Sequence, residues 1–472
     1  MKAFDEKNLN DAPNLDLLFV NPTLDWKMDL EKKQVARIEK NIPNQETPHI
    51  GIAYLLAVAK KEGLRAKYLD MVMEGISLEQ LIEYVAQKRP SLIGLTAFTV
   101  QARTAGIVAQ RLKALFPSIK VCLGGPHASA LPKETLEEYP EIDFVCSGEG
   151  ESLLRKLKDA LGDLKQIFQL PGIISRTQIG FTRNKESKLD DLPFPAWDMF
   201  DLTKYQGTYP HRTKLELPMI TGRGCPFKCT FCCRSLGDSL RRRSVPSVMT
   251  EIEHHIEKFK CESIAFLDET FIVDKDWIGT FLETMIEKEI NRQVTWSCST
   301  RVSNMTPSLL KKMKAAGCYY IFYGLESADN EILKRINKGI TVEQMKNAIQ
   351  WTKEAGILPV GAFIIGLEGD TEDHVIKAIN LAQELDLYSV TFPIAVPFPG
   401  TKLREMALRN EYGMRIISDN WDDYGKQNPG VLESRDLPWD KRRELQRLAY
   451  ARNPKKELDK YINRMKGMGY PY

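Results

Sequence analysis

The chain has 472 residues, a length typical of two or three domains. Charged residues make up 27% of it and hydrophobic residues 43%, and 66 Lys and Arg against 63 Asp and Glu leave a net charge of +3. This near-neutral balance does not indicate nucleic acid or an anionic membrane surface as a partner.

Residues 1–7 carry charges of both signs and lack the apolar core of a secretory signal. The apolar stretch Ile50–Ala59 is too short to span a bilayer. The nine cysteines are sparse, odd in number and mostly inside apolar runs, which suits a reducing compartment rather than a disulfide framework. We therefore expect a cytoplasmic protein without a membrane span.

Short apolar runs alternate with helical patterns in the first third of the chain. The helical pattern at 50–61 is one of these. The expected strands are residues 15–20, 66–70, 92–96, 121–123 and 144–146. This alternation predicts an α/β domain with a parallel, doubly wound, Rossmann-like sheet, whose ligands lie beyond the carboxyl ends of the strands.

Glycines and small polar residues follow these strands, and they permit close approach of the backbone to a bulky, phosphate-bearing ligand. Glycine and proline also simply end strands, and neither a GxGxxG nor a Walker A pattern is present. The candidate ligand-facing residues are Asn21, Pro22, Thr96, Ala97, Thr99, Gly124, Gly125, Pro126, His127, Gly148 and Glu149.

A second alternating series follows a proline-rich segment. Its expected strands are residues 217–221, 263–267, 294–298, 320–323, 359–365 and 389–393. Six βα units fall short of a closed eight-unit barrel, so a partial barrel is predicted. We expect four parts: the doubly wound domain over 1–184, a strap over 185–215, a partial (β/α)6 barrel over 216–408, and a C-terminal helical cap over 409–472.

Four of the nine cysteines lie between residues 225 and 233, directly after the first strand of the second series. Cys225, Cys229 and Cys232 have the spacing C-x3-C-x2-C, so three thiolates of one loop can hold three corners of a cubane [4Fe–4S] cluster. The fourth iron then stays open to a chelating substrate. A structural zinc site is the alternative, but it usually takes two paired ligand sets and no second C-x2-C pair follows. Cys233 fits poorly as a fourth ligand, because adjacent side chains point apart.

This loop, with the aromatic Phe231 before its last cysteine, resembles that of the radical S-adenosylmethionine (SAM) superfamily. The resemblance implies SAM contacts at the ends of the following strands, in the order of the family's motifs. Each position also has a purely structural explanation, because carboxylates cap helices and glycines are common in turns. The implied SAM-contacting residues are Phe231, Asp268, Glu269, Arg301, Glu326, Ser327, Gly361 and Gly366.

A doubly wound domain ahead of such a barrel resembles the cobalamin-binding branch of this superfamily, and this implies that cobalamin lies over the strand ends of the first domain. The better-known cobalamin motif D-x-H-x-x-G is absent, because Val72 stands where Asp70–Gly75 would need its histidine. No histidine ligand to cobalt is therefore expected, and His127 is expected to be a hydrogen-bonding loop residue.

The resemblance implies three cofactors: a [4Fe–4S] cluster, SAM and cobalamin, carried as methylcobalamin. It further implies methyl transfer from SAM to an unactivated carbon of a small-molecule or peptide substrate, with a flavodoxin- or ferredoxin-type electron donor. No acid–base or nucleophilic arrangement stands out, so no catalytic side chain is assigned. A non-methylating radical reaction such as cyclisation, ring contraction or elimination stays open. A cobalamin- or cluster-binding sensor ranks last, because the last ~60 residues hold only a basic helical segment.

Overall fold

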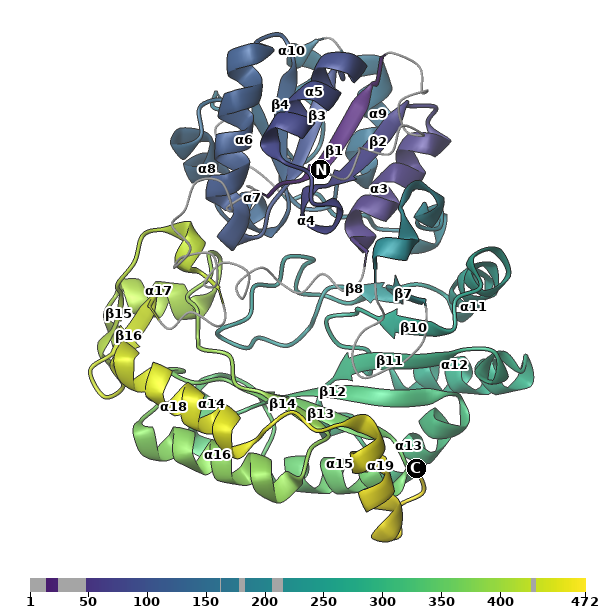
Figure 1. Ribbon diagram of the computed structural model, residues 1–472, viewed down its shortest axis with the longest axis vertical. Coiled ribbons are helices and arrows are strands. Elements are labelled where there is room, and N and C mark those ends of the chain that lie inside the picture. The colour runs from purple at the N-terminus through teal and green to yellow at the C-terminus, as the bar shows by residue number, and fades with distance from the viewer. Residues whose placement is uncertain (1–13, 24–47, 162, 178–182, 206–214, 426–429) are drawn as a thin grey trace. The chain divides into compact units, whose positions relative to one another are not determined.

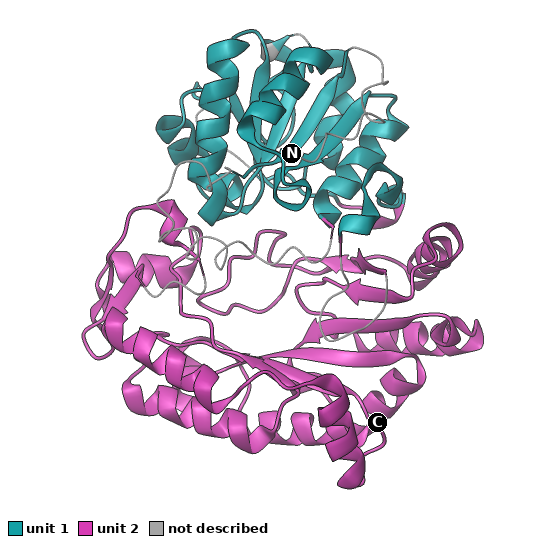
Figure 2. Ribbon diagram, viewed as in Figure 1, with its two compact units in different colours: residues 1–39, 49–186, 191–204 teal, residues 40–48, 187–190, 205–472 magenta. Residues whose placement is uncertain are grey.

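The computed structural model describes residues 14–23, 48–161, 163–177, 183–205, 215–425 and 430–472. The chain divides into two compact units, shown in Figure 2: residues 1–39, 49–186 and 191–204 form the first, and residues 40–48, 187–190 and 205–472 the second. Our expectations for residues 1–7 and for 206–214 of the strap lie outside the described residues. The domain boundaries expected at residues 184, 215 and 408 stay predictions.

The first unit is built on a six-stranded sheet (Figure 1). Its strands are β1 (Leu17–Asn21), β2 (Ala66–Asp70), β3 (Leu92–Thr96), β4 (Lys120–Gly124), β5 (Phe144–Cys146) and β6 (Ile173–Ile174). Their order is β2-β1-β3-β4-β5-β6, and the first five pair in parallel. The predicted doubly wound sheet is confirmed. Strand β6, antiparallel to β5, was not predicted, because two residues are too short to show a period.

Helices connect these strands. They are α3 (Ile50–Lys61), α4 (Met71–Glu74), α5 (Leu78–Lys88), α6 (Ala102–Leu115), α7 (Pro126–Ala130), α8 (Pro132–Glu138), α9 (Glu151–Ala160) and α10 (Leu164–Ile167). Helix α5 begins at a capping box, in which the Gln80 N–H donates to Ser77 Oγ at 3.2 Å and the Ser77 N–H donates to Gln80 Oε1 at 2.9 Å. The proline-rich segment also belongs to this unit: Trp197 is fully buried, and the Ala196 N–H donates to the carbonyl of Ala53 in α3 at 3.0 Å.

The second unit holds a six-stranded parallel sheet whose spatial order follows the chain. Its strands are β7 (Glu216–Met219), β10 (Ser263–Phe266), β11 (Thr295–Thr300), β12 (Cys318–Glu326), β13 (Leu358–Phe363) and β14 (Ser389–Thr391). In the described part of the chain β7 and β14 each pair with one neighbour, so the barrel is open, as predicted.

Each of the first five strands of the barrel, in chain order, is followed by at least one outer helix. These helices are α11 (Val245–His254), α12 (Lys275–Glu287), α13 (Pro307–Ala315), α14 (Asn330–Arg335), α15 (Val342–Glu354) and α16 (Glu372–Leu385). Every one of them begins after a Ser, Thr or Asp whose side chain accepts a hydrogen bond from the first turn. Such N-caps satisfy backbone donors that the helix itself cannot, which is why the helices start where they do.

The C-terminal part adds helices α17 (Lys402–Leu408), α18 (Trp439–Arg452) and α19 (Leu458–Gly467). Tyr461 and Met465 of α19 pack against Leu358, Val360 and Tyr388 of the barrel, as expected for a cap. Two short antiparallel pairs were not predicted: β8 (Gly222–Arg223) with β9 (Arg241–Arg242), and β15 (Met414–Ile416) with β16 (Leu432–Ser434). Among the described helices, none combines the length and apolarity needed to cross a bilayer.

Candidate functional site

The three cysteines lie together in the segment between β8 and β9. We name residues 224–233 the Cys loop. Cys225 and Cys229 are half-buried, Cys232 is exposed, and all three are free thiols. Burial raises the pKa of Cys225, and negative charge on the neighbouring Glu269 and Cys229 raises it further.

The donor set of the Cys loop suits a cluster better than a single ion. In the parts of the chain that are described, no three His, Cys, Asp or Glu side chains converge on a point where one metal ion would sit. A cubane cluster places each thiolate on a different iron, so its ligands need not share one centre. Thiolates are also the ligands that iron–sulfur clusters take. The residues present thus fit a [4Fe–4S] cluster, and the assignment of Cys225, Cys229 and Cys232 as its ligands stays a prediction.

Arg301, which follows β11, reaches the Cys loop. Its Nη1 lies 3.5 Å from Cys229 Sγ, and its guanidinium carbon lies 3.8 Å from the ring centroid of Phe227. The carbonyl oxygen of Asn337 lies 3.9 Å from the same sulfur. Arg301 is 6% exposed, so its charge acts in a poorly solvated setting beside the Cys229 thiol. Phe231 lies half-buried within the loop.

The acidic pair after β10 divides into two environments. Asp268 is buried, and its carboxylate accepts from the Thr221 N–H at 3.0 Å and the Thr221 hydroxyl at 2.6 Å. Arg242 Nη1 also donates to the Thr221 hydroxyl, at 2.9 Å. Asp268 therefore ties the end of β10 to the end of β7. Glu269 is exposed by its surface area, yet partial burial raises the pKa of its carboxyl to about 7, and a hydrogen bond from the backbone of Gly224 in the Cys loop acts in the opposite direction.

Glu326 ends β12 in a left-handed backbone conformation, with φ at 68°. Its Oε1 accepts from Lys338 Nζ at 2.8 Å, and both side chains are buried. The Ile364 N–H donates to the Glu326 carbonyl at 2.9 Å and so joins the ends of β12 and β13. Ser327 Oγ accepts from the N–H of Asp329 at 3.2 Å, so its hydroxyl is already oriented by the following turn.

Gly361 lies inside the fully buried strand β13, and Gly366 opens a turn beyond its end. We name residues 366–370 the glycine turn. Gly366 has φ at 87°, and a Cβ there would meet the buried guanidinium of Arg442, so glycine is required. Asp370 Oδ2 accepts from the N–H groups of Gly366 at 3.0 Å and Leu367 at 3.1 Å. Burial raises the pKa of Asp370 to about 7.

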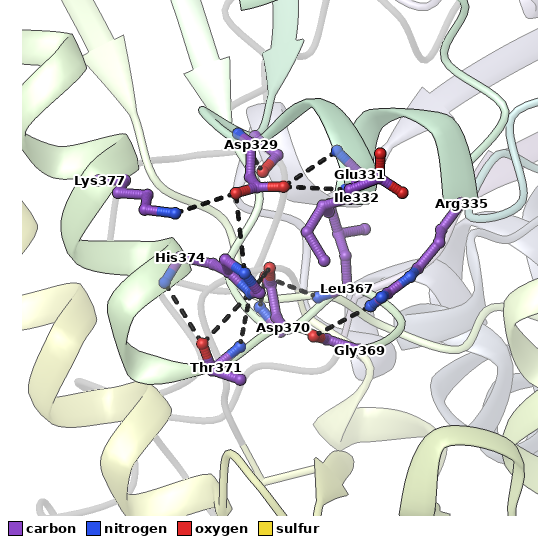
Figure 3. Close-up of polar contacts among 12 residues, drawn as sticks. Asp329, Glu331, Ile332, Arg335, Leu367, Gly369, Asp370, Thr371, His374 and Lys377 are labelled. Atoms are coloured by element: carbon purple, nitrogen blue, oxygen red, sulfur yellow. Dashed lines mark hydrogen bonds and ion pairs between the residues drawn. The ribbon is translucent and has the colours of Figure 1, made fainter.

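Figure 3 shows how the ends of β12 and β13 are joined by side chains. His374 of α16 lies between two carboxylates, with Nε2 3.8 Å from Asp329 and Nδ1 4.0 Å from Asp370. Lys377 Nζ donates to Asp329 at 3.0 Å, and Arg335 Nη1 lies 3.5 Å from the carbonyl of Gly369. The segments that contain Ser327 and Gly366 are therefore held in a fixed relation.

In the first unit, a buried polar network joins the carboxyl ends of the first three strands. Asn21 Nδ2 donates to Asp70 Oδ1 at 2.9 Å, and Asn21 Oδ1 accepts from Gln101 at 3.0 Å. Asp70 Oδ2 accepts from the hydroxyl of Tyr68 at 2.9 Å, and Asp70 Oδ1 caps α4 through the Met73 N–H. The Asp70–Gly75 spacing thus has a structural explanation, because Asp70 caps the start of α4 and Gly75 its end. Gln101 was not found from sequence because it belongs to no motif.

The glycine-rich loops after β4 and β5 lie at the same edge. Gly125 has φ at 94°, and a Cβ there would lie 2.8 Å from the Ala97 carbonyl oxygen, so only glycine fits. His127 is 1% exposed and lies in helix α7 instead of the loop expected from sequence, and its assignment to cobalamin stays a prediction. Glu149 Oε2 accepts from the Glu186 N–H at 2.9 Å. Gly148 bridges to Asn184 in extended pairing.

The remaining candidates fall at the same edge, by their places in the chain. Pro22 follows β1, Thr96 ends β3 and is followed by Ala97 and Thr99, and Gly124 ends β4 and is followed by Pro126. Parallel pairing aligns these strand ends, so the predicted residues form one continuous edge. The half-buried Gly124 leaves room there, because a Cβ would meet only two carbonyl oxygens at 3.9 Å. The assignment of this edge to cobalamin stays a prediction.

Sequence reasoning missed four residues around the Cys loop: Thr230, Asn337, Lys338 and Glu368. Thr230 and Glu368 are hydrogen-bonded across 138 positions, and no spacing rule links positions so far apart. A signal was present for Asn337 and Lys338, because an Asn-Lys-Gly run after a short helix indicates a turn. It did not indicate what that turn would touch.

Comparison with known proteins agrees with this geometry. The radical SAM superfamily model matches residues 219–382, and the B12 binding domain model matches residues 43–158. An uncharacterized methyltransferase of Pyrococcus horikoshii is 32% identical over 419 residues, which cover 87% of this chain and 88% of the relative. An anaerobic magnesium-protoporphyrin IX monomethyl ester cyclase of Rubrivivax gelatinosus is 28% identical, over 81% of this chain and 69% of the relative.

The fold has a solved counterpart. The radical SAM methyltransferase TsrM of Kitasatospora setae, solved with cobalamin and a [4Fe–4S] cluster bound, superposes with a TM-score of 0.68 at 17% identity. The superposition covers 93% of this chain and 89% of TsrM. With both family models matched in order and a relative above 30% identity along most of its length, the chain belongs to the cobalamin-dependent radical SAM methyltransferases, whose cofactors are a [4Fe–4S] cluster, SAM and cobalamin.

Proposed function

We propose that this enzyme transfers the methyl group of SAM to an unactivated carbon of a small-molecule or peptide substrate. The observation that carries the proposal is the Cys loop itself. It presents three free thiols and has Arg301 3.5 Å from one of them. A separate doubly wound unit with a glycine-rich strand edge precedes it in the same chain. Two cofactor sites in one chain support a reaction that needs both.

The roles of the residues follow from their settings. Cys225, Cys229 and Cys232 would hold the cluster, and Arg301 and Glu269 would bind the carboxylate and amino groups of SAM. When bound, the cluster supplies the electron that cleaves SAM, and cobalamin carries the methyl group. Glu326 is fixed by Lys338 at the strand end where a ribose would lie. No side chain is assigned as a general acid or base.

The test follows the methyl group. Full-length enzyme is reconstituted anaerobically with iron, sulfide and cobalamin and incubated with methyl-labelled SAM, a reductant and candidate substrates. Label in a carbon–methyl bond of the product, together with 5′-deoxyadenosine, is the expected result. If 5′-deoxyadenosine forms while the product carries no label, methyl transfer is wrong and only radical SAM chemistry stands.

Two matched cysteine variants check the cluster assignment. Cys229→Ala should abolish 5′-deoxyadenosine formation, because a cubane cluster with two remaining thiolates is poorly held. Cys233→Ala, four positions away in the same loop, should keep it. Full turnover by Cys229→Ala, or loss of turnover in Cys233→Ala alone, would contradict the assignment.

A second candidate function is a radical reaction without methyl transfer. The relative of Rubrivivax gelatinosus, named as a cyclase, favours keeping it open. Its signature is an unlabelled product that is cyclised, contracted or dehydrated relative to the substrate. The same labelling experiment therefore separates the two functions.

We further propose a flavodoxin- or ferredoxin-type electron donor and a cytoplasmic location. The nine cysteines are all free thiols, which supports a reducing compartment. Reduced flavodoxin or ferredoxin should replace dithionite in the cleavage assay. If neither supports SAM cleavage by an enzyme that is active with dithionite, the donor proposal is wrong.

A further inference from the structure

Thr230, the residue after the second cysteine of the Cys loop, is held by three separate elements. Its side chain and backbone are 4% exposed. Its N–H donates to the carbonyl of Ile336 at 3.1 Å, and its carbonyl accepts from the N–H of Leu403 in α17 at 2.9 Å. Its hydroxyl donates to Glu368 Oε1. The segment between Cys229 and Cys232 is thus fixed at its first residue.

Glu368 depends on that hydroxyl. The residue is 1% exposed, and within the described residues its Oε2 has no hydrogen-bond partner. Burial raises the pKa of its carboxyl, and the hydrogen bond from Thr230 acts in the opposite direction. A buried carboxyl without a donor is costly, so the contact with Thr230 stabilises both groups.

Glu368 lies in the glycine turn, which is itself rigid. Asp370 accepts hydrogen bonds from the N–H groups of Gly366 and Leu367, and Arg335 Nη1 lies against the carbonyl of Gly369 (Figure 3). Arg335 ends α14, and the next residue is Ile336, whose carbonyl accepts from the Cys loop. One helix end therefore supports both the glycine turn and the Cys loop.

We propose that Thr230 and Glu368 are positioning residues that fix the Cys loop to the glycine turn, so that SAM binding and the geometry of the cluster ligands depend on each other. This rests on the proposed function, because it takes the Cys loop as the cluster site and the glycine turn as part of the SAM site. Neither residue touches the reacting atoms. Their effect passes through the backbone between Cys229 and Cys232.

The test measures the cluster rather than methyl transfer. Full-length, reconstituted wild type, Thr230→Val and Thr230→Ser are compared for the rate at which an iron chelator removes the cluster, with and without SAM. In wild type and Thr230→Ser, SAM should slow cluster loss. In Thr230→Val the loss should be about tenfold faster and no longer slowed by SAM, because one buried hydrogen bond to a carboxylate is gone. The change that SAM causes in the electron paramagnetic resonance spectrum of the reduced cluster should vanish in parallel.

Three further variants keep the result interpretable. Glu368→Gln retains an acceptor for the Thr230 hydroxyl and should behave as wild type, whereas Glu368→Leu should reproduce Thr230→Val. Thr300→Val removes a buried hydroxyl that has no hydrogen-bond partner in the described structure, so it should leave the rates unchanged.

The outcomes separate the two levels of the proposal. If Thr300→Val assembles a cluster and Thr230→Val assembles none, the positioning role is supported, because the cysteines then fail to hold the cluster at all without the Thr230 hydrogen bond. If Thr230→Val and Glu368→Leu keep both the wild-type rate and the protection by SAM, the positioning role is overturned while the proposed function stands. If wild type assembles no cluster at all, the proposed function fails and this inference fails with it.

Discussion

Arg301 and Cys229 are in direct contact although 72 positions separate them, with Arg301 Nη1 3.5 Å from Cys229 Sγ. The guanidinium is held in place by the ring of Phe227, two residues before that cysteine, at 3.8 Å. A cation so placed stabilises a thiolate and can also bind a carboxylate. The charge of Arg301, at the end of β11, therefore acts directly on the Cys loop.

The first prediction concerns this cation. Arg301→Gln should lower the rate of reductive SAM cleavage by about tenfold or more, the effect of losing one charge-assisted contact. Arg301→Lys should lower this rate by a smaller factor, because it keeps the charge and loses only the planar stacking on Phe227. The rate of 5′-deoxyadenosine formation with dithionite, normalised to iron content, measures both. Arg292→Gln, which removes an exposed arginine, is the control. Equal rates for Arg301→Gln and wild type would contradict the prediction.

The buried ion pair at the end of β12 gives the second prediction. Lys338→Met leaves the Glu326 carboxylate buried without its cation, which should lower the free energy of unfolding by about 3–5 kcal/mol. The double variant Lys338→Met with Glu326→Gln should recover a large part of that loss, since no unpaired charge remains. Denaturant unfolding of the cluster-free chain measures this cycle.

A matched lysine serves as control for that cycle. Lys353 is 8% exposed, but its Nζ donates to a backbone carbonyl at 3.1 Å instead of a carboxylate. Lys353→Met should therefore lower the free energy of unfolding by less than Lys338→Met does. If the double variant is no more stable than Lys338→Met, the two side chains do not act as a pair.

The strands that build both units could be predicted from sequence, because buried parallel strands appear as apolar runs such as Leu92–Thr96 and Ser263–Phe266. The β8–β9 pair escaped prediction because each strand has two residues and carries arginines. Arg442 also escaped: its helix is strongly charged, yet this side chain is fully buried against Gly366. Hydrophobic patterning describes the average face of a helix, whereas burial of one cation depends on partners that are distant in sequence.

The cysteine spacing predicted the Cys loop as a unit because its members are close in the chain. The side chains that support it, Thr230 and Glu368, meet only through folding. Local spacing identifies groups that one loop brings together, and it contains no information on contacts between loops. This is why the candidate metal ligands were identifiable and their supporting residues were not.

Asp370 gives a prediction on pH. Burial raises its pKa in the folded chain to about 7, against about 3.9 in an unfolded chain. The group faces Arg442, His374 and Glu368. Because the folded state holds the proton more tightly, the stability that this carboxyl contributes is complete below pH 4 and is lost as the pH rises to about 7.

Asp370→Asn, which cannot titrate, should therefore become more stable relative to wild type as the pH rises. We expect the melting temperature of the variant minus that of wild type to increase by about 5–10 °C between pH 5 and pH 8, because a carboxyl with these two pKa values loses about 2–3 kcal/mol over that range and 1 kcal/mol shifts the melting temperature by about 2–4 °C. Thermal unfolding of the cluster-free chain at both pH values measures it. A difference that stays constant with pH would show that Asp370 does not titrate in this range.

The last prediction tests the strand edge of the first unit separately from the cluster. Gly124 is half-buried at the end of β4, has a negative φ, and a Cβ there meets only carbonyl oxygens at 3.9 Å. A leucine is therefore compatible with the fold, but its side chain would fill the edge where cobalamin is expected. Gly124→Leu should keep its melting temperature and lose affinity for cobalamin by about tenfold or more. Gly279→Leu on α12, where an added Cβ meets open space, should keep the wild-type melting temperature and the wild-type affinity for cobalamin.

Spectral titration of the purified full-length chain with cobalamin measures the affinity, and thermal unfolding measures the fold. The two readouts separate a blocked site from a damaged one, because only a blocked site loses affinity at unchanged melting temperature. Unchanged affinity in Gly124→Leu would place cobalamin away from the β4 end. Since Gly125 cannot accept a side chain without displacing the Ala97 backbone, substitutions there would not distinguish these cases, and Gly124 is the position that does.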